Sequence, residues 1–125
     1  MFALNADDDG KLLEFSYPLQ YKGNVIPVDG KNVAGRVVIS KRPYLSNNVQ
    51  KDKSHIFFSW LIGGKVLPVQ KMIVFPVIFA ERVIAILKIV KKGPDPETAG
   101  IDFKRSDIKE IDSIVNTILT LHVVK

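Results

Sequence analysis

"MIVFPVIFAERVIAILKIV", residues 72–90, is the stretch that decides the fold of this chain. It is apolar along most of its length, but Pro76 and the pair Glu81-Arg82 interrupt it, so it does not have the pattern of a membrane-spanning helix. The charged pair separates two apolar segments, which is typical of two buried strands joined by a tight turn. We therefore predict an antiparallel hairpin with its turn at Glu81-Arg82.

A second hairpin is predicted over residues 2–19. The segments "FALNA" and "KLLEFSYPL" flank "DDDG", whose aspartates and glycine suit a tight turn with a positive φ at Gly10. A loop containing Gly23, Pro27 and Gly30 is expected to follow this hairpin.

A short helix is predicted from Lys31 to about Ser40, with an apolar face formed by Val33, Ala34, Val37 and Val38. Gly35 lies inside it, which suggests a close approach of another backbone segment. The helix ends there because Pro43 pushes Arg42 away from helical angles. Residues 44–49 then form a short strand.

The last element is predicted to be a helix from about Arg105 or Ser106 to Val123, with Ser106 as its N-cap. Strands dominated by hairpins, together with a few helices, indicate an α+β domain: an antiparallel β-sheet with flanking helices. At 125 residues, the chain has the size of one domain, residues 1–125.

Composition excludes several kinds of function. The chain has no cysteine, which rules out disulfides, thiolate metal sites and a cysteine nucleophile. The net charge is +5, but the basic residues occur in scattered pairs that are not interleaved with aromatic residues, so we expect no nucleic-acid binding. The N-terminal sequence has neither a basic leader nor an apolar core of signal-peptide length. We expect a cytoplasmic location without direct membrane insertion.

No catalytic or metal site is predicted. The serines occur in no nucleophile motif, and no pair of carboxylates is placed by a motif for acid–base chemistry. The chain has only two histidines, His55 and His122, and neither has the neighbours that complete a metal-ligand set. Haem ligation through His55 is a minor alternative.

With this order of elements, residues 30–110 resemble the GAF domain family. "VAGRVVISKRPYLSNNV" is similar to the helix start and the proline step of that family, and "KMIVFPVIFAERVIAILKIVKK" is similar to its central hairpin. Ala85 stands where the family usually has glycine. The resemblance implies a GAF/PAS-like fold, and Pro43 then marks the junction between a helix that covers the sheet and the strand beside the ligand cavity.

A third block of the resemblance contains Lys92, Phe103 and Asp107, which match an extended motif of cyclic-nucleotide-binding relatives. Lys91 replaces the asparagine of that motif and Ile108 replaces its glutamate. In the family the lysine–aspartate pair is largely structural, so the match supports the fold more than a particular ligand. These domains usually begin with a helix before the first strand. The sequence shows no such helix, so we expect the chain to be a segment of a larger signalling protein, with the usual first helix missing.

The resemblance and an aromatic-rich segment beside the sheet together suggest a partly apolar ligand pocket. We place seven residues around it: Tyr44, Asn47, His55, Phe57, Phe58, Trp60 and Phe75. The alternative for each of the large aromatic residues is that it fills the core. The ligand class stays open, with a cyclic nucleotide or another small molecule as candidates.

The last helix is more apolar than one sheet contact requires. Ile108, Ile111, Val115, Ile118 and His122 recur at helical spacing, and Ile114, Leu119 and Leu121 widen that surface. We therefore expect a homodimer through terminal helices. The alternative is that the missing first helix would cover this surface.

The expected function is a non-catalytic regulatory domain that senses a small molecule in a cavity beside the sheet and relays the signal through its terminal helices to an output domain of the same protein. The alternative is a ligand-free dimerisation or scaffold domain. Some relatives reduce free methionine sulfoxide, but they use cysteines, so we expect no enzyme here.

Overall fold

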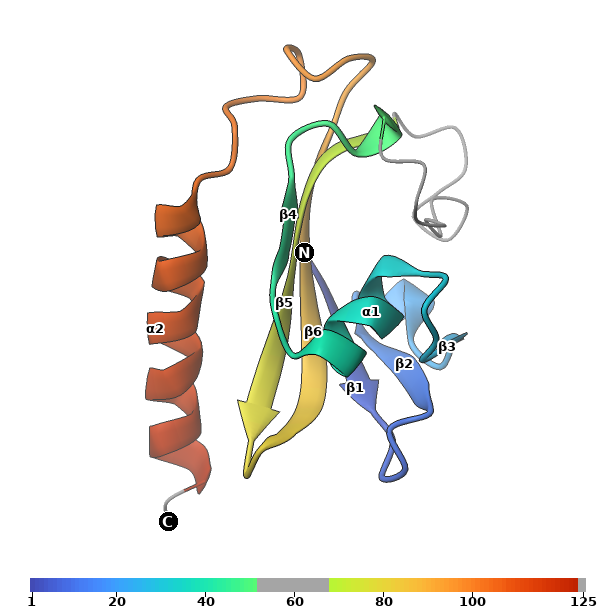
Figure 1. Cartoon of the computed structure of the whole chain (residues 1–125), viewed down its shortest axis with the longest axis vertical. Coiled ribbons are helices and arrows are strands. Elements are labelled where there is room, and N and C mark those ends of the chain that lie inside the picture. Colours follow the sequence, from blue (N-terminus) through green and yellow to red (C-terminus); the bar gives the residue numbers. More distant parts are fainter. Residues whose placement is uncertain (52–67, 124–125) are drawn as a thin grey trace.

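A computed structural model describes residues 1–51 and 68–123. It contains a six-stranded sheet with one α-helix on each face, as Figure 1 shows. The elements in chain order are β1 (Phe2–Ala6), β2 (Leu12–Tyr17), η1 (Leu19–Tyr21), β3 (Val25–Pro27), α1 (Val33–Ser40), β4 (Tyr44–Ser46), η2 (Val49–Lys51), β5 (Val69–Phe79), β6 (Arg82–Lys92) and α2 (Arg105–Val123). This architecture confirms the predicted α+β class with an antiparallel sheet.

The sheet order is β3-β2-β1-β6-β5-β4, and all neighbouring strands are antiparallel. The two predicted hairpins, β1–β2 and β5–β6, therefore lie side by side, joined through β1 and β6. Strand β3 was not predicted, because its segment was expected to be a loop. It is an edge strand of three residues, and an edge position tolerates the missing N–H of Pro27.

The turn of the central hairpin lies one residue earlier than predicted. Ala80 and Glu81 form it with φ values of 52° and 66°, and Arg82 already pairs with Phe79 in the ladder. Two successive residues with positive φ match the twist of a hairpin. The ammonium of Lys41 donates a hydrogen bond of 2.7 Å to the carbonyl of Glu81, which ties the end of α1 to this turn.

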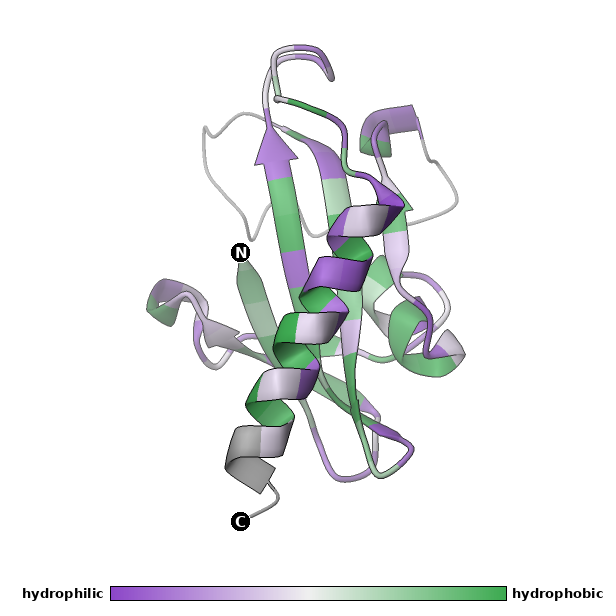
Figure 2. Cartoon of the chain, turned by 90° about the vertical axis from the view of Figure 1, so that its left-hand side faces the viewer, coloured by the Kyte–Doolittle hydropathy of each residue, from purple (hydrophilic) through white to green (hydrophobic). Residues whose placement is uncertain are grey.

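The two faces of the sheet carry separate apolar clusters, because successive strand residues point to opposite faces. On the face covered by α1, which we call the α1 face, the buried members include Phe2, Val74 and Ile86 together with Val33 and Val37 of the helix. The opposite face, the α2 face, packs Ile73, Phe75, Val77, Phe103 and Val115. Figure 2 shows α2 lying across this second face.

The ends of α1 follow from local sequence. The side chain of Asn32 caps the helix by accepting a hydrogen bond of 2.6 Å from the N–H of Gly35. At the other end, Lys41 adopts a left-handed conformation with φ of 60° before the chain reaches Pro43. The predicted close approach at Gly35 is confirmed: a Cβ there would lie 2.6 Å from the nitrogen of Asp29 and nearer still to its carbonyl oxygen.

The start of α2 corrects the predicted cap. The helix already includes Ser106, so Ser106 is not the N-cap residue. Instead, the carboxylate of Asp107 accepts a hydrogen bond of 2.8 Å from the N–H of Lys104, as the third residue of a capping box does. None of the helices in the described ranges is long and apolar enough to cross a membrane.

Candidate functional site

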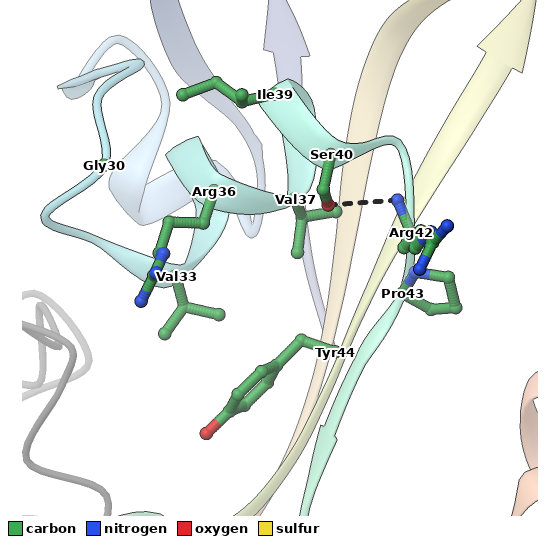
Figure 3. A pocket seen from close by; sticks show the side chains of 9 residues that line it. All are labelled: Gly30, Val33, Arg36, Val37, Ile39, Ser40, Arg42, Pro43 and Tyr44. Atoms are coloured by element: carbon green, nitrogen blue, oxygen red, sulfur yellow. Dashed lines mark hydrogen bonds between the residues drawn. The ribbon is translucent and has the colours of Figure 1, made fainter.

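A pocket of about 420 Å³ lies between α1 and the start of β4. Its size falls within the range of small-molecule sites, roughly 300–1,000 Å³. Figure 3 shows Val33 and Val37 pointing from the helix toward Tyr44 on the strand. The lining residues are Gly30, Val33, Arg36, Val37, Ile39, Ser40, Arg42, Pro43 and Tyr44. We call this cavity the α1 pocket.

The walls of the α1 pocket combine apolar surface with a few polar groups. Valine, isoleucine and proline side chains supply the apolar part, and the Tyr44 ring adds an aromatic face. Two arginines, Arg36 and Arg42, are also among the lining residues. The hydroxyl of Ser40 accepts a hydrogen bond of 3.2 Å from the N–H of Arg42, which holds the chain in position between α1 and β4. Such a surface suits a small molecule with an apolar body and a polar or anionic group.

The structure separates Tyr44 from Phe75. Tyr44 pairs with Val74 in the β4–β5 ladder and packs on the α1 face. Phe75 is the next residue along β5, so it points to the α2 face, where it is 6% exposed. There it lines a second, smaller cavity of about 270 Å³ between β5 and α2. The two predicted pocket residues therefore lie on opposite faces and share no cavity.

Asn47 is engaged with the chain segment that leads into α2. Its amide nitrogen donates a hydrogen bond of 3.0 Å to the carbonyl of Phe103, and its amide oxygen accepts one of 2.8 Å from the N–H of the same residue. The amide of Asn47 thus pairs with the backbone of Phe103 as a residue of a neighbouring strand would. It ties the end of β4 to the start of α2 instead of turning its polar atoms toward the α1 pocket. We call this pair of bonds the Asn47–Phe103 clamp.

Four of the predicted pocket residues, His55, Phe57, Phe58 and Trp60, lie outside the described residues. Of the seven residues placed around a pocket by the sequence, Tyr44 is the one that lines the α1 pocket in the described part of the chain.

Phe103, from the third block of the resemblance, packs on the α2 face. The ring of Phe103 is 9% exposed and carries the ammonium of Lys91 at 4.5 Å from its centroid, a cation–π contact. Lys91 also donates a hydrogen bond of 2.6 Å to the carbonyl of Ile101. The carboxylate of Asp107 is used as a helix cap.

Lys71 and Asp102, which lie outside the third block, also hold the segment before α2 against the sheet. The ammonium of Lys71 lies 2.7 Å from a carboxylate oxygen of Asp102 and 2.6 Å from the carbonyl of Gly100. The Lys71 side chain is 4% exposed, whereas that of Asp102 is 66% exposed. A strand of the sheet is thereby fastened to the segment before α2 at a second point, close to the Asn47–Phe103 clamp.

Sequence reasoning missed Lys88. This residue lies in the middle of β6, is 6% exposed and belongs to the α1 face. Burial lowers the pKa of its ammonium from 10.5 to about 8. The sequence does contain a pattern that could have identified it. Lys88 lies two residues after the fully buried Ile86, so strand alternation places its side chain on the same buried face.

No family model and no curated protein matches this sequence. Solved structures do match. The GAF domain of a phosphoenolpyruvate-protein phosphotransferase from Coxiella burnetii gives a TM-score of 0.70 at 12% identity, over 91% of this chain and 65% of that one. A methyl-accepting chemotaxis protein gives a TM-score of 0.70 at 16% identity, over 99% of this chain and 79% of that one.

The free methionine-R-sulfoxide reductase from Neisseria meningitidis, solved in complex with its substrate, gives a TM-score of 0.64 at 18% identity, over 91% of this chain and 60% of that one. The chain thus spans 65% of the Coxiella domain and 60% of the Neisseria enzyme. At sequence identities this low, the structural similarity establishes a common fold and nothing further. Together with the antiparallel sheet, the two flanking helices and the pocket under α1, these similarities show that the chain has the GAF-domain fold.

Proposed function

We propose that this chain is a non-catalytic regulatory domain that binds a small molecule on the α1 face of its sheet and relays binding through α2. The observation that carries this proposal is the α1 pocket, about 420 Å³ in volume, with mainly apolar walls and two arginines among its lining residues. Few convergent polar groups on a mainly apolar surface are typical of a small-molecule site. We expect the domain to act in the cytoplasm, within a larger signalling protein that supplies the output domain.

A route from the pocket to α2 runs along β4. Tyr44, the first residue of this strand, lines the α1 pocket, and Asn47, just after its end, holds the backbone of Phe103 at the entrance to α2. A ligand that shifts β4 therefore acts directly on the segment that positions α2. Relay also requires that the ligand bind two arrangements of β4 with different affinity, because equal affinity would shift no population.

The absence of cysteine supports a non-catalytic role. The methionine sulfoxide reductases implied by the family resemblance use cysteines, and this chain cannot supply that chemistry.

A thermal-unfolding scan of the purified chain tests the proposal. The compounds are cyclic mononucleotides, cyclic dinucleotides, nucleobases, amino acids and haem. A ligand at 100 times its dissociation constant adds about 2.7 kcal/mol to the free energy of unfolding, which raises the Tm of a domain of this size by roughly 8–16 °C. We expect one compound class to produce such a shift.

A pocket-filling variant makes the test specific. Ser40 is exposed on the last turn of α1 and lines the α1 pocket, so Ser40→Trp should fill the cavity and abolish the ligand-induced shift. Ser113→Trp adds the same bulk at an exposed position of α2 and should leave the shift unchanged. A shift that survives Ser40→Trp would place the ligand elsewhere and contradict the proposal.

A second candidate function is a ligand-free dimerisation domain. The observation that favours it is the pair of exposed isoleucines on α2, Ile114 at 54% and Ile118 at 50% exposed. No response to any compound, from a chain that is a folded dimer throughout, would favour this alternative over the sensor.

A further inference from the structure

Lys88 lies at the centre of the sheet, where β6 runs between β1 and β5. Its ladder partners are Phe2 on β1 and Val74 on β5. Ile86 and Val90, two residues away on either side, both pack on the α1 face, so the side chain of Lys88 points to that face as well. An ammonium group is thus carried into an apolar cluster, and the residue as a whole is only 6% exposed.

The ammonium of Lys88 forms no hydrogen bond or ion pair within residues 1–51 and 68–123. No side-chain nitrogen or oxygen in these residues is both fully buried and without a partner. The unpaired ammonium must therefore keep a small contact with accessible space. Lysines are almost never buried unless they are paired, since an unpaired charge in a protein interior is strongly unfavourable. Such a group at the edge of accessible space is suited to receive an anion.

The other charges on this face do not neutralise Lys88. No carboxylate is buried in the described part of the chain. Among the described residues, the titratable groups that share the face include the phenols of Tyr21 and Tyr44 and, by strand alternation, the ammonium of Lys92 further along β6, and α1 contributes Arg36 to the lining of the α1 pocket. Within the described residues, the α1 face therefore offers Lys88 no buried carboxylate.

We propose that Lys88 is the counter-cation for an oxyanion, either a carboxylate or a phosphate, carried by a small molecule that binds on the α1 face. This inference rests on the proposed function, which places the ligand on that face. Tyr44, Val74 and Lys88 form one cross-strand row. Two strand spacings put the Cα atoms of Tyr44 and Lys88 about 10 Å apart, so a ligand of nucleotide size can contact both.

The protonation state of Lys88 fits this role. Burial lowers the pKa of the ammonium to about 8, so the group is still predominantly protonated at neutral pH and available to an anion. A bound oxyanion stabilises the charged form and must raise this pKa.

The test uses the complete chain, with inorganic phosphate and acetate as probes and sodium chloride at the same ionic strength as the blank. Two quantities are measured: the Tm, and the pH titration of the lysine Cε–Hε NMR signals, in which Lys88 is assigned by its loss in Lys88→Arg. The variants are Lys88→Met, which keeps the length and removes the charge, Lys88→Arg, which keeps the charge, and Lys22→Met, which removes an exposed lysine.

We expect one of the two probes to raise the Tm beyond the chloride blank and to raise the pKa of Lys88. Whichever probe acts identifies the oxyanion as a phosphate or a carboxylate. Lys88→Met should weaken the response to that anion about 30-fold or more, as expected when one partner of a buried charge pair is removed. Lys88→Arg should retain most of the response, and Lys22→Met all of it.

Two results would overturn the inference: an unchanged anion response in Lys88→Met, or no response of the wild-type chain to either anion. Its failure can be told apart from failure of the proposed function. A neutral compound that shifts the Tm of both wild type and Lys88→Met, but not of Ser40→Trp, would leave the α1 pocket as a ligand site and remove Lys88 from it. An anion response that depends on Lys88 but persists in Ser40→Trp would support the oxyanion site and contradict the α1 pocket.

Discussion

Lys88 imposes a pH dependence on the stability of the ligand-free protein. Its pKa is lowered from 10.5 to about 8 by burial, and its ladder neighbours Phe2 and Val74 carry no charge. Between these two pH values the unfolded chain holds a proton that the folded chain has released. The free energy of unfolding therefore rises with pH across this window, and below about pH 8 the folded state bears the full penalty.

We expect Lys88→Met to raise the free energy of unfolding at pH 7 by up to about 3 kcal/mol, which is the size of this pKa shift expressed as energy. The gain over wild type should shrink as the pH rises toward 10.5. Urea denaturation of both proteins at pH 7 and pH 10 measures it, with Lys22→Met as the exposed control. A Lys88→Met protein no more stable than wild type at pH 7 would show that the ammonium is adequately solvated in the fold.

The Asn47–Phe103 clamp gives a second prediction for a single residue. Asn47→Ala removes both bonds and leaves the N–H and C=O of Phe103 unpaired in a part-buried place. Loss of such partners typically costs about 1–3 kcal/mol each, so we expect the free energy of unfolding to fall by about 2 kcal/mol. Urea denaturation checks this.

The matched control is Asn48→Ala at the adjacent position. Asn48 takes part in the described structure through its backbone, whose N–H donates to Ser46 and whose carbonyl accepts from Lys51. Its substitution should change the stability by less than about 0.5 kcal/mol. Equal effects of the two substitutions would mean that the amide of Asn47 contributes nothing specific to holding α2.

Among the elements, α1 depends most on one glycine. A Cβ at Gly35 would lie 2.6 Å from the backbone nitrogen of Asp29, so Gly35→Ala must push the helix away from the loop before it. Overpacking of this kind costs about 1–3 kcal/mol. Because α1 forms one wall of the α1 pocket, the same change should also weaken the response to any pocket ligand, and thermal unfolding with and without that ligand measures both effects.

Gly30 supplies the control for α1. It lines the same pocket, but a Cβ built on it meets no atom within 4 Å. Gly30→Ala should therefore leave the Tm within a degree or two, as expected for an exposed change of less than about 0.5 kcal/mol. If Gly35→Ala proves as harmless as Gly30→Ala, the contact with Asp29 is not what positions α1.

The elements that the sequence predicted well are those with a strong local signal. Both hairpins have apolar segments separated by a polar turn, and α1 ends where Pro43 requires it. Strand β3 was missed because three residues ending in Pro27 carry no strand pattern of their own, and only pairing with β2 makes them a strand. The position of the central turn at Ala80 could not be predicted from the sequence either, because a positive φ at two residues other than glycine has no sequence signature.

The candidate site was less predictable, because it depends on strand register. Tyr44 could be placed beside a cavity from the proline step before it, and the structure finds it there. The positions of Phe75 and Lys88 depend on the β4–β5 and β5–β6 ladders. Only when these ladders are known does it follow that Phe75 points to the opposite face and Lys88 to the α1 face. A shift of one residue in the β4–β5 ladder would reverse the assignment of Phe75, and one in the β5–β6 ladder would reverse that of Lys88.

At the scale of the whole molecule, the sheet separates a ligand-sized cavity from the helix that would report on it. The α1 pocket lies on one face and α2 covers the other, and the polar contacts that join the sheet to the α2 side include the Asn47–Phe103 clamp and the Lys71–Asp102 ion pair. Both fasten the sheet to the segment before α2 and not to the helix itself. Under the proposed function, movement of β4 or β5 would change where α2 begins, and the signal would be read at the outer surface of α2.

That outer surface carries the last prediction, which concerns assembly. Val115 is 9% exposed and packs on the sheet, whereas Ile114 and Ile118 are 54% and 50% exposed. Figure 2 shows apolar segments on the side of α2 that is turned away from the sheet.

We propose that a second copy of the chain covers Ile114 and Ile118. Ile114→Lys with Ile118→Lys should then convert a dimer to a monomer without unfolding it, because neither side chain is part of the core. Sedimentation equilibrium and circular dichroism measure the two effects. Ser113→Lys with Thr120→Lys adds the same charge at exposed positions away from the pair and should leave the dimer intact. A wild-type chain that stays monomeric at every concentration would contradict this assembly and also the ligand-free dimerisation function that depends on it.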